Sequence, residues 1–255
     1  MNESMMNVVA KQLSEASRIL FVTGAGLSAD SGLPTYRGVG GLYEDADTPE
    51  GMPIEAVLSG SMMQRNPALV WKHILEIERA CRGAKPNRGH EVMAALQEQH
   101  EVVVLTQNVD GLHRAAGSAH VIEIHGRVDR LVCTVCDYQE DVEDYSGLTF
   151  HDGVVSCPQC QSVVRPAVVL FDEMLPDEAM ARLRAEVRQG FDLVFTVGTS
   201  SGFPYIAAPV YLQVERGRPA YEINPGLTEV SEAVTHRFEG RAAVVLDELW
   251  QRSLA

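Results

Sequence analysis

Short apolar runs that end in glycine or in polar turns alternate along this chain with segments of helical periodicity. Such alternation is typical of a parallel sheet whose strands are connected by helices. It predicts strands at 19–23, 102–106, 121–124, 193–197 and 220–223, and helices at 67–82, 89–99, 176–188, 205–215 and from 242 to the C-terminus. We therefore expect an α/β fold built on a doubly wound, Rossmann-type parallel sheet.

Two regions, residues 36–85 and 127–165, do not show this alternation of apolar runs and helical segments. The second contains two CxxC pairs and a turn-rich, acidic middle, and we interpret both regions as insertions. We expect them to form a smaller domain, with a helical insert at 36–85 and a zinc ribbon at 127–165. The larger, Rossmann-type domain would then consist of residues 1–35, 86–126 and 166–255. A chain of 255 residues is long enough for one sizeable core with such a module.

The charge of the chain argues against two classes of partner. Lys and Arg number 21 against 35 Asp and Glu, and the net charge of −14 repels nucleic-acid phosphates and anionic lipid headgroups. The uncharged stretch 193–214 is long enough for a membrane span, but its glycines and prolines divide it into a strand, a turn and a helix. We expect no nucleic-acid partner and no membrane partner. The first residues lack the pattern of a secretory signal. Four of the five cysteines form two CxxC pairs, which fit a metal in a reducing compartment better than a disulfide scaffold and so favour the cytoplasm.

Cys133-x-x-Cys136 and Cys157-x-x-Cys160 are separated by twenty residues. This is the spacing of a zinc ribbon, in which two knuckles supply four thiolates to one tetrahedral ion. Four thiolates leave no open coordination position, so the expected zinc is structural. A redox dithiol is the alternative interpretation. The acidic residues between the two pairs argue against a ribbon that binds nucleic acid.

Glycines follow the first predicted strand in the sequence Gly24-Ala25-Gly26. They allow a sharp turn and a close approach of the backbone to a phosphate. Ala29 occupies the place of the third glycine in the usual dinucleotide fingerprint, so the ordinary dehydrogenase loop is not present. A plain turn between strand and helix is the alternative.

Polar side chains stand at the ends of four later predicted strands. The strand 102–106 is followed by Gln107, Asn108 and Asp110, at the edge of an open α/β sheet where ligands bind. For Asn108 or Asp110 taken alone, an Asx-turn that caps the next helix is the alternative. His125 follows the strand 121–124 and has a side chain suited to general-base catalysis near neutral pH. The two remaining strand ends, which suit contacts to ribose and adenine, carry Gly198, Thr199, Ser200 and Asn224.

The order of these motifs resembles the sirtuins, the NAD-dependent protein lysine deacylases. The segments that carry the resemblance are GAGLSADSGLPTYRG, TQNVDGLH, IEIHG, the paired CxxC motifs, RPAVVLFDE, VGTSS and EINP, and they cover essentially the whole chain. The resemblance implies a large Rossmann-type domain, a small domain of zinc ribbon and helical insert, and an active-site cleft between them. It also implies NAD, a structural Zn²⁺ and acylated lysines of proteins or peptides as ligands. Alternatives are a protein ADP-ribosyltransferase and a non-catalytic, NAD-sensing interaction protein.

The resemblance assigns roles in binding NAD and in catalysis. Tyr36 matches the aromatic residue that shields the bond between nicotinamide and ribose. Asn108, Asp110 and His125 are the implied catalytic residues, with His125 as general base and Asp110 and Val109 as the holders of the carboxamide. The full set of implied NAD contacts is Gly24, Ala25, Gly26, Ala29, Tyr36, Arg37, Gln107, Asn108, Val109, Asp110, Gly198, Thr199, Ser200, Asn224 and Ala242.

The resemblance also indicates how the acylated substrate would bind. The segment that would pair with the peptide and line the acyl-lysine tunnel contains Val168, Val169, Phe171 and Glu173. Relatives selective for acidic acyl groups carry a Tyr-x-x-Arg pair on the helical insert, whereas Ile74 and Ile77 fall near those places here. We therefore expect neutral acyl groups to be preferred. Two departures from the family pattern are Thr35, where many relatives have Asp, and Asp172, where many have Gly.

Overall fold

The computed structural model describes residues 3–34 and 48–254. Its larger sheet has six parallel strands in the order β10-β9-β8-β1-β2-β3. The strands are β1 (Arg18–Thr23), β2 (Glu101–Thr106), β3 (Val121–Glu123), β8 (Leu193–Val197), β9 (Ala220–Ile223) and β10 (His236–Phe238). The chain first adds β2 and β3 on one side of β1. It then crosses to the other side of β1 and adds β8, β9 and β10 in turn. The doubly wound parallel fold expected from the sequence is confirmed.

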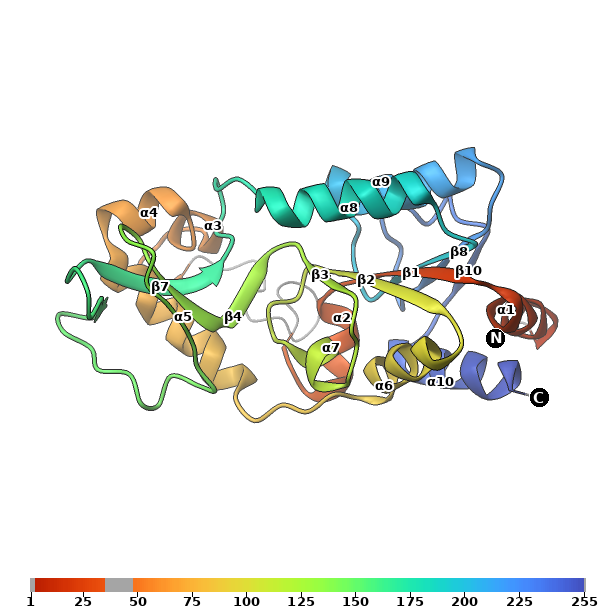
Figure 1. Ribbon diagram of the computed structural model, residues 1–255, viewed down its shortest axis with the longest axis horizontal. Coiled ribbons are helices and arrows are strands. Elements are labelled where there is room, and N and C mark those ends of the chain that lie inside the picture. The colour runs from red at the N-terminus through yellow and green to blue at the C-terminus, as the bar shows by residue number, and fades with distance from the viewer. Residues whose placement is uncertain (1–2, 35–47, 255) are drawn as a thin grey trace.

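Helices cover both faces of this sheet, as Figure 1 shows. One face packs against α1 (Glu3–Glu15), α6 (Arg88–Ala95) and α10 (Ala242–Ser253) in a single apolar core cluster. The other face packs against α8 (Asp177–Gln189) and α9 (Pro204–Glu215). Because neither face meets water, all five residues of β8 are buried, and four of the five are apolar.

A second, antiparallel sheet carries the cysteine pairs. Its order is β5-β4-β7-β6, formed by β4 (Gly126–Cys133), β5 (Gln139–Asp141), β6 (Val155–Ser156) and β7 (Val163–Val168). It packs with α3 (Ile54–Val57), α4 (Gly60–Arg65) and α5 (Pro67–Cys81) at one end of the molecule (Figure 1). The fully buried Trp71 of α5 donates its indole N–H to the carbonyl of Val164 at 2.9 Å, which fixes the helix on the sheet.

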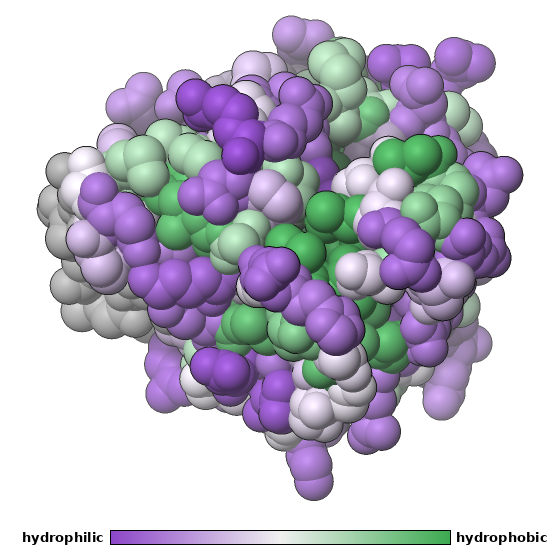
Figure 2. All heavy atoms as spheres, turned by 90° about the vertical axis from the view of Figure 1, so that its left-hand side faces the viewer, coloured by the Kyte–Doolittle hydropathy of each residue, from purple (hydrophilic) through white to green (hydrophobic). Residues whose placement is uncertain are grey.

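The small-sheet end of the molecule is shown in Figure 2, where apolar patches lie between polar side chains. A pocket of about 430 Å³ is lined by Leu75 and Phe150 together with Ala68, Lys72, Glu76, Arg79 and Gly153. Along the part of the chain that the structure describes, no helix is long and apolar enough to cross a membrane.

Two elements of the larger sheet's layers were not expected from the sequence. These are α1 and the short edge strand β10. The small sheet extends past both ends of the predicted ribbon segment, since β4 begins at Gly126 and β7 reaches Val168. Here the two strands pair Gly126 with Val168, directly after β3. The division of the chain into two domains at the stated boundaries stays a prediction.

Candidate active site

Two glycine-containing loops meet where the sheet changes direction, between β1 and β8. Gly26 donates its N–H to the carbonyl of Gly198 at 2.8 Å, and a Cβ on Gly26 would lie 2.8 Å from the Gly198 Cα. Gly198 itself has a φ of +60°, so a side chain at either position would force the loops apart. This is the switch point at which open α/β sheets bind ligands. Ala25 lies in the short helix α2 (Ala25–Ser28), and Ala29 is exposed in the 3₁₀ turn Ala29–Ser31.

A chain of hydrogen bonds connects the loop after β1 with the loop after β2. Asn108 donates through Nδ2 to the Gly24 carbonyl and to the Ser28 Oγ, both at 3.0 Å. Ser28 in turn donates to Asp110 Oδ2 at 2.6 Å. The other oxygen of Asp110 accepts from the N–H of Leu112, which is the Asx-turn that the sequence left as an alternative. The same carboxylate therefore both shapes its loop and lies in the polar cluster.

Gln107 connects β2 with the strand ends on the opposite side of β1. Its Nε2 donates to Thr199 Oγ1 at 2.6 Å. Asn224, which follows β9, donates its Nδ2 to the carbonyl of Thr199 at 3.1 Å. Ser200 is exposed beside them. The structure therefore brings these polar groups from three strand ends to one edge of the sheet.

His125 follows β3 and is held at both ring nitrogens. Nδ1 lies 3.1 Å from the carbonyl of Gln107, and Nε2 lies 2.7 Å from the hydroxyl of Tyr205. A carbonyl can only accept, so in the neutral ring the proton sits on Nδ1 and Nε2 carries the free lone pair. Burial lowers the pKa of His125, and the bond to the Gln107 carbonyl opposes part of that shift. The imidazole is therefore neutral near pH 7, as a proton acceptor must be.

The segment expected to bind the peptide begins beside His125. The N–H of Val169 donates to the carbonyl of His125 at 2.9 Å, and Val168 pairs with Gly126. Farther on, Phe171 donates its N–H to the carbonyl of Leu58, which connects this segment with the end of α3. The predicted general base and the predicted peptide-binding segment are thus adjacent.

Two carboxylates stabilise the turn after that segment. Glu173 accepts two bonds from the Arg165 guanidinium, at 2.5 and 2.9 Å, and one from the Leu170 N–H. Asp172 has a φ of +64°, a conformation that usually requires the glycine found at this place in many relatives. Its carboxylate offsets that strain by accepting from the N–H of Gly60 at 2.8 Å and from the side chain of Ser61. Asp172 thereby fastens the turn to the first residues of α4.

Other predicted residues lie elsewhere. Ile74 and Ile77 pack within the apolar cluster of the small sheet, where Ile74 is buried and Ile77 partly so. Ala242 is the first residue of α10 and is buried in the larger core. Val109 is partly buried, and its carbonyl accepts from the Val128 N–H. Thr35, Tyr36 and Arg37 lie outside the described residues.

Sequence reasoning did not single out three side chains of this cluster: Ser28, Phe203 and Tyr205. The rings of Phe203 and Tyr205 stack with centroids 5.4 Å apart, and both touch the His125 ring edge-on. A signal was available, because two aromatic residues two positions apart directly follow the polar turn after β8.

The four cysteines of the two CxxC pairs come together as one cluster. Their sulfur atoms all lie within 4.8 Å of one another, with Cys133 to Cys160 at 3.5 Å and Cys136 to Cys157 at 3.6 Å. A tetrahedral zinc with bonds of about 2.3 Å holds its sulfur ligands roughly 3.8 Å apart, whereas a disulfide requires about 2 Å. Backbone N–H groups of the first knuckle point at the Cys133 sulfur. The cluster therefore fits a closed, structural zinc site.

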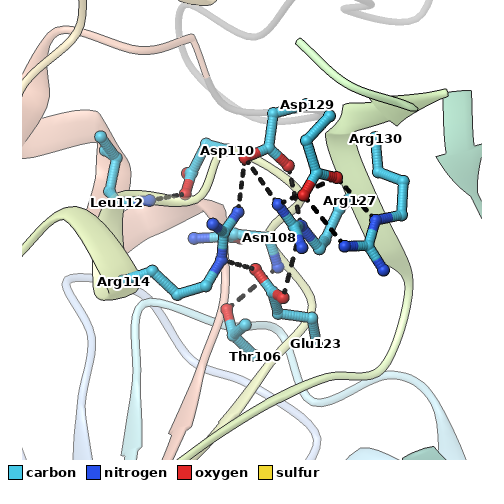
Figure 3. A network of polar contacts seen from close by, with 10 residues as sticks. Thr106, Asn108, Asp110, Leu112, Arg114, Glu123, Arg127, Asp129 and Arg130 are labelled. Atoms are coloured by element: carbon cyan, nitrogen blue, oxygen red, sulfur yellow. Dashed lines mark hydrogen bonds and ion pairs between the residues drawn. The ribbon is translucent and has the colours of Figure 1, made fainter. Parts of the chain in front are cut away.

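An ion-pair network lies between the polar cluster and the small sheet (Figure 3). Arg114 of α7 (Leu112–Ala115) pairs with Glu123 of β3 at 3.0 Å and with Asp129 of β4 at 2.8 Å. Arg127 binds the same Asp129 with two nitrogens, at 2.9 and 3.1 Å. These pairs connect the loop that carries Asp110 with the first residues of the antiparallel sheet.

Comparison with known proteins agrees with this geometry. Residues 24–203 match the Sir2 family. The chain is 49% identical to "NAD-dependent protein deacylase 2" of Pseudomonas aeruginosa over 97% of both chains, and 36% identical to "NAD-dependent protein deacylase" of Thermococcus sibiricus over 94% and 93%.

Solved structures extend the similarity to three dimensions. A Sir2 homologue in complex with NAD superposes with a TM-score of 0.85 at 32% identity, covering 100% of this chain and 94% of the other. A Sir2 protein with a deacetylated p53 peptide and 3′-O-acetyl ADP-ribose gives a TM-score of 0.84 at 28% identity, covering 96% and 97%. The match to the family and the identity to these relatives together show that the chain belongs to the Sir2 family.

Proposed function

We propose that this protein is an NAD-dependent lysine deacylase that removes acetyl and other neutral acyl groups from proteins or peptides. The observation that carries the proposal is the place of the His125 imidazole, between the polar strand ends of the parallel sheet and the segment from Val168. The names of the curated relatives and the ligands of the related structures support it. A chain with four thiol ligands for zinc suits the reducing cytoplasm.

The strand ends fit the parts of NAD. Glycines at the switch point let the two loops pack closely there, at the place where open α/β sheets bind phosphates, and Thr199 and Asn224 offer a hydroxyl and an amide for the adenosine side. When bound, NAD supplies a ribose carbon that the acyl oxygen of the lysine amide attacks as nicotinamide leaves. Asn108 and Asp110, connected through Ser28, would orient the nicotinamide end. This chain of bonds would fix the orientation of both side chains at the nicotinamide end.

His125 would act after nicotinamide has left. Its Nε2 accepts a proton from a ribose hydroxyl, so that the ribose oxygen attacks the acyl carbon. The Gln107 carbonyl holds the Nδ1 proton in place and thereby keeps the lone pair on Nε2. The products are the free lysine, nicotinamide and O-acyl-ADP-ribose.

The preference for neutral acyl groups rests on α5. Ile74 and Ile77 present hydrocarbon where acid-selective relatives have tyrosine and arginine, and an unpaired buried carboxylate costs several kcal/mol. Arg79, a candidate cation on this helix, lines the pocket of about 430 Å³ together with Lys72 and Glu76. It is therefore turned away from the buried Ile74.

Purified protein incubated with NAD and one carrier peptide, acetylated or succinylated at the same lysine, tests the proposal by mass spectrometry. We expect NAD-dependent loss of the acetyl group, with O-acetyl-ADP-ribose as product, at least tenfold faster than loss of succinyl. ADP-ribose attached to protein without deacylation would indicate a transferase, and NAD binding without any product would indicate a sensor. Equal rates on the two peptides would contradict the preference for neutral acyl groups but not the deacylase activity.

A further inference from the structure

Tyr205 contacts the nitrogen of His125 that must receive a proton. Its hydroxyl lies 2.7 Å from Nε2, while the Gln107 carbonyl occupies Nδ1. Since Nε2 carries the lone pair of the neutral ring, the phenol is the donor in this bond. Burial raises the pKa of Tyr205 to about 12, so the phenol keeps its proton at neutral pH.

The phenol is held in this place by packing. The rings of Tyr205 and Phe203 stack at an interplanar angle of 13°, and Tyr205 belongs to the first turn of α9. Among the described residues, the hydrogen-bond and ring partners of the His125 side chain are the Gln107 carbonyl, the Tyr205 hydroxyl and the two aromatic rings. Of these groups only Tyr205 is titratable, and no described carboxylate or cation contributes to the pKa shift of His125.

A hydroxyl can serve both protonation states of the imidazole. It donates to Nε2 while the ring is neutral, and after rotation about its C–O bond it accepts from Nε2–H once the ring is charged. The second bond is charge-assisted and therefore the stronger of the two. The Gln107 carbonyl offers the charged ring no new bond, because it already accepts from Nδ1–H in the neutral ring.

We propose that Tyr205 is a positioning residue for His125, which fixes the ring for proton transfer and stabilises the imidazolium that forms. The inference rests on the proposed deacylase function. In the step concerned, the phenol O–H first turns away from Nε2 and leaves the Nε2 lone pair to the ribose hydroxyl. The ribose O–H bond then breaks and the Nε2–H bond forms, while Tyr205 remains a neutral phenol whose oxygen accepts from Nε2–H. The proton thus ends on His125, and the electron pair stays on the ribose oxygen that attacks the acyl carbon.

The test replaces Tyr205 with Phe, which keeps the ring and its stacking and removes only the hydroxyl. A matched control is Tyr211→Phe on the same helix, where the hydroxyl donates to the Glu229 carbonyl at 3.1 Å, outside the cluster. A hydrogen bond to a charged group corresponds to roughly a 10- to 100-fold effect, so we expect kcat for deacylation to fall by about that factor in Y205F and to stay unchanged in Y211F. KM for the peptide and nicotinamide exchange should change much less.

The pH profile separates this role from a merely structural one. Loss of the bond that favours the imidazolium moves the acid limb of the kcat profile to lower pH in Y205F. If Tyr205 only shielded His125 from water, removal of its hydroxyl would move that limb toward the ordinary histidine value, which would overturn the proposal. An unchanged kcat in Y205F would overturn it as well.

A direct measurement does not depend on turnover. Nitrogen-15 NMR of the His125 ring over a pH titration should show the proton on Nδ1 in the neutral ring of both proteins, because the Gln107 carbonyl accepts it in both, and protonation of Nε2 at a lower pH in Y205F. An identical titration in the two proteins would contradict the inference even if the wild type had no deacylase activity. Conversely, an inactive wild type with the expected spectra would refute the proposed function alone.

Discussion

The side chains at the polar edge of the sheet divide into two sets with separate supports. Asp110 is connected through Ser28 to Asn108 and to the loop after β1. His125 is held instead by the Gln107 carbonyl and by Tyr205 of α9. No hydrogen bond among the described side chains joins the Asp110 carboxylate directly to the His125 ring. Two separate steps of the reaction can therefore depend on the two sets.

Substitution of these residues should separate the two steps. General-base catalysis contributes about 10²- to 10⁴-fold, so His125→Ala should lower deacylation by that factor and affect nicotinamide exchange less, because exchange reports only the departure and return of nicotinamide. Asp110→Ala should impair both activities, since it removes the acceptor of Ser28 and of the Leu112 N–H. Equal losses of exchange and deacylation in the two variants would show that His125 also supports the first step.

A buried histidine pair behind the polar cluster makes stability dependent on pH. His90 and His113 lie with ring centroids 4.8 Å apart, and burial lowers the pKa of His90 to about 4 and that of His113 to about 3. In the unfolded chain both histidines titrate near 6.5. The unfolded state therefore takes up protons first as pH falls, and the stabilisation present above pH 6.5 is lost below it.

We expect the free energy of unfolding in urea to be constant between about pH 7 and 8 and to fall between pH 6.5 and 5 by roughly 1.4 kcal/mol per pH unit for each of these histidines. Carboxylates with lowered pKa values change the free energy of unfolding mainly below pH 5, because their pKa values in the unfolded chain lie near 4. A flat profile from pH 6.5 to 5 would contradict the burial of neutral imidazoles at these positions.

At the scale of elements, the cysteine cluster holds together strands that have little else to stabilise them. β5 and β6 have three and two residues, and no residue of either strand is fully buried. The sulfur atoms come from segments on both sides of the acidic loop that separates the CxxC pairs. A bound zinc would therefore contribute directly to the folding of the small sheet.

Loss of one sulfur should remove both metal and activity. Cys133→Ser leaves three thiolates, and we expect elemental analysis to find one zinc per chain in the wild type and none in the variant, with deacylation lost as well. Cys81→Ser is the matched control, because Cys81 stands outside the cluster at the end of α5. Full activity after complete zinc removal would contradict the structural role.

At the scale of the whole molecule, the sequence predicted the parallel sheet and its polar edge because both leave local signals. A strand buried on both faces is a mostly apolar run, and β8 is an example. The short β10 leaves no such signal, because its three residues pair only with β9 at the sheet edge. The hydrogen bond between Tyr205 and His125 could not be predicted from the sequence either, because it joins residues 80 positions apart and depends on how α9 packs on the sheet.

An ion-pair network around Asp129, which Figure 3 shows, connects the two sheets. Arg114 contacts both Glu123 of the parallel sheet and Asp129 of the antiparallel sheet. The side chains of Arg114 and Asp129 are 33% and 31% exposed, so water screens the pair and its loss costs only about 1 kcal/mol. We expect a larger effect on function than on stability, because Arg114 lies four residues after Asp110 and connects this part of the chain to Asp129 of the small sheet.

Asp129→Asn keeps the shape of the side chain and removes the charge that both arginines share. We expect KM for NAD and for the peptide to rise by roughly 3- to 10-fold, since each 1.4 kcal/mol of positioning energy corresponds to a factor of ten, while the melting temperature changes by only a few degrees. Asp141→Asn is the control, because Asp141 pairs chiefly with Arg130 at the exposed edge of the small sheet and reaches Arg127 only at 3.7 Å. If both variants keep wild-type KM values, this network does not position the two sheets relative to each other.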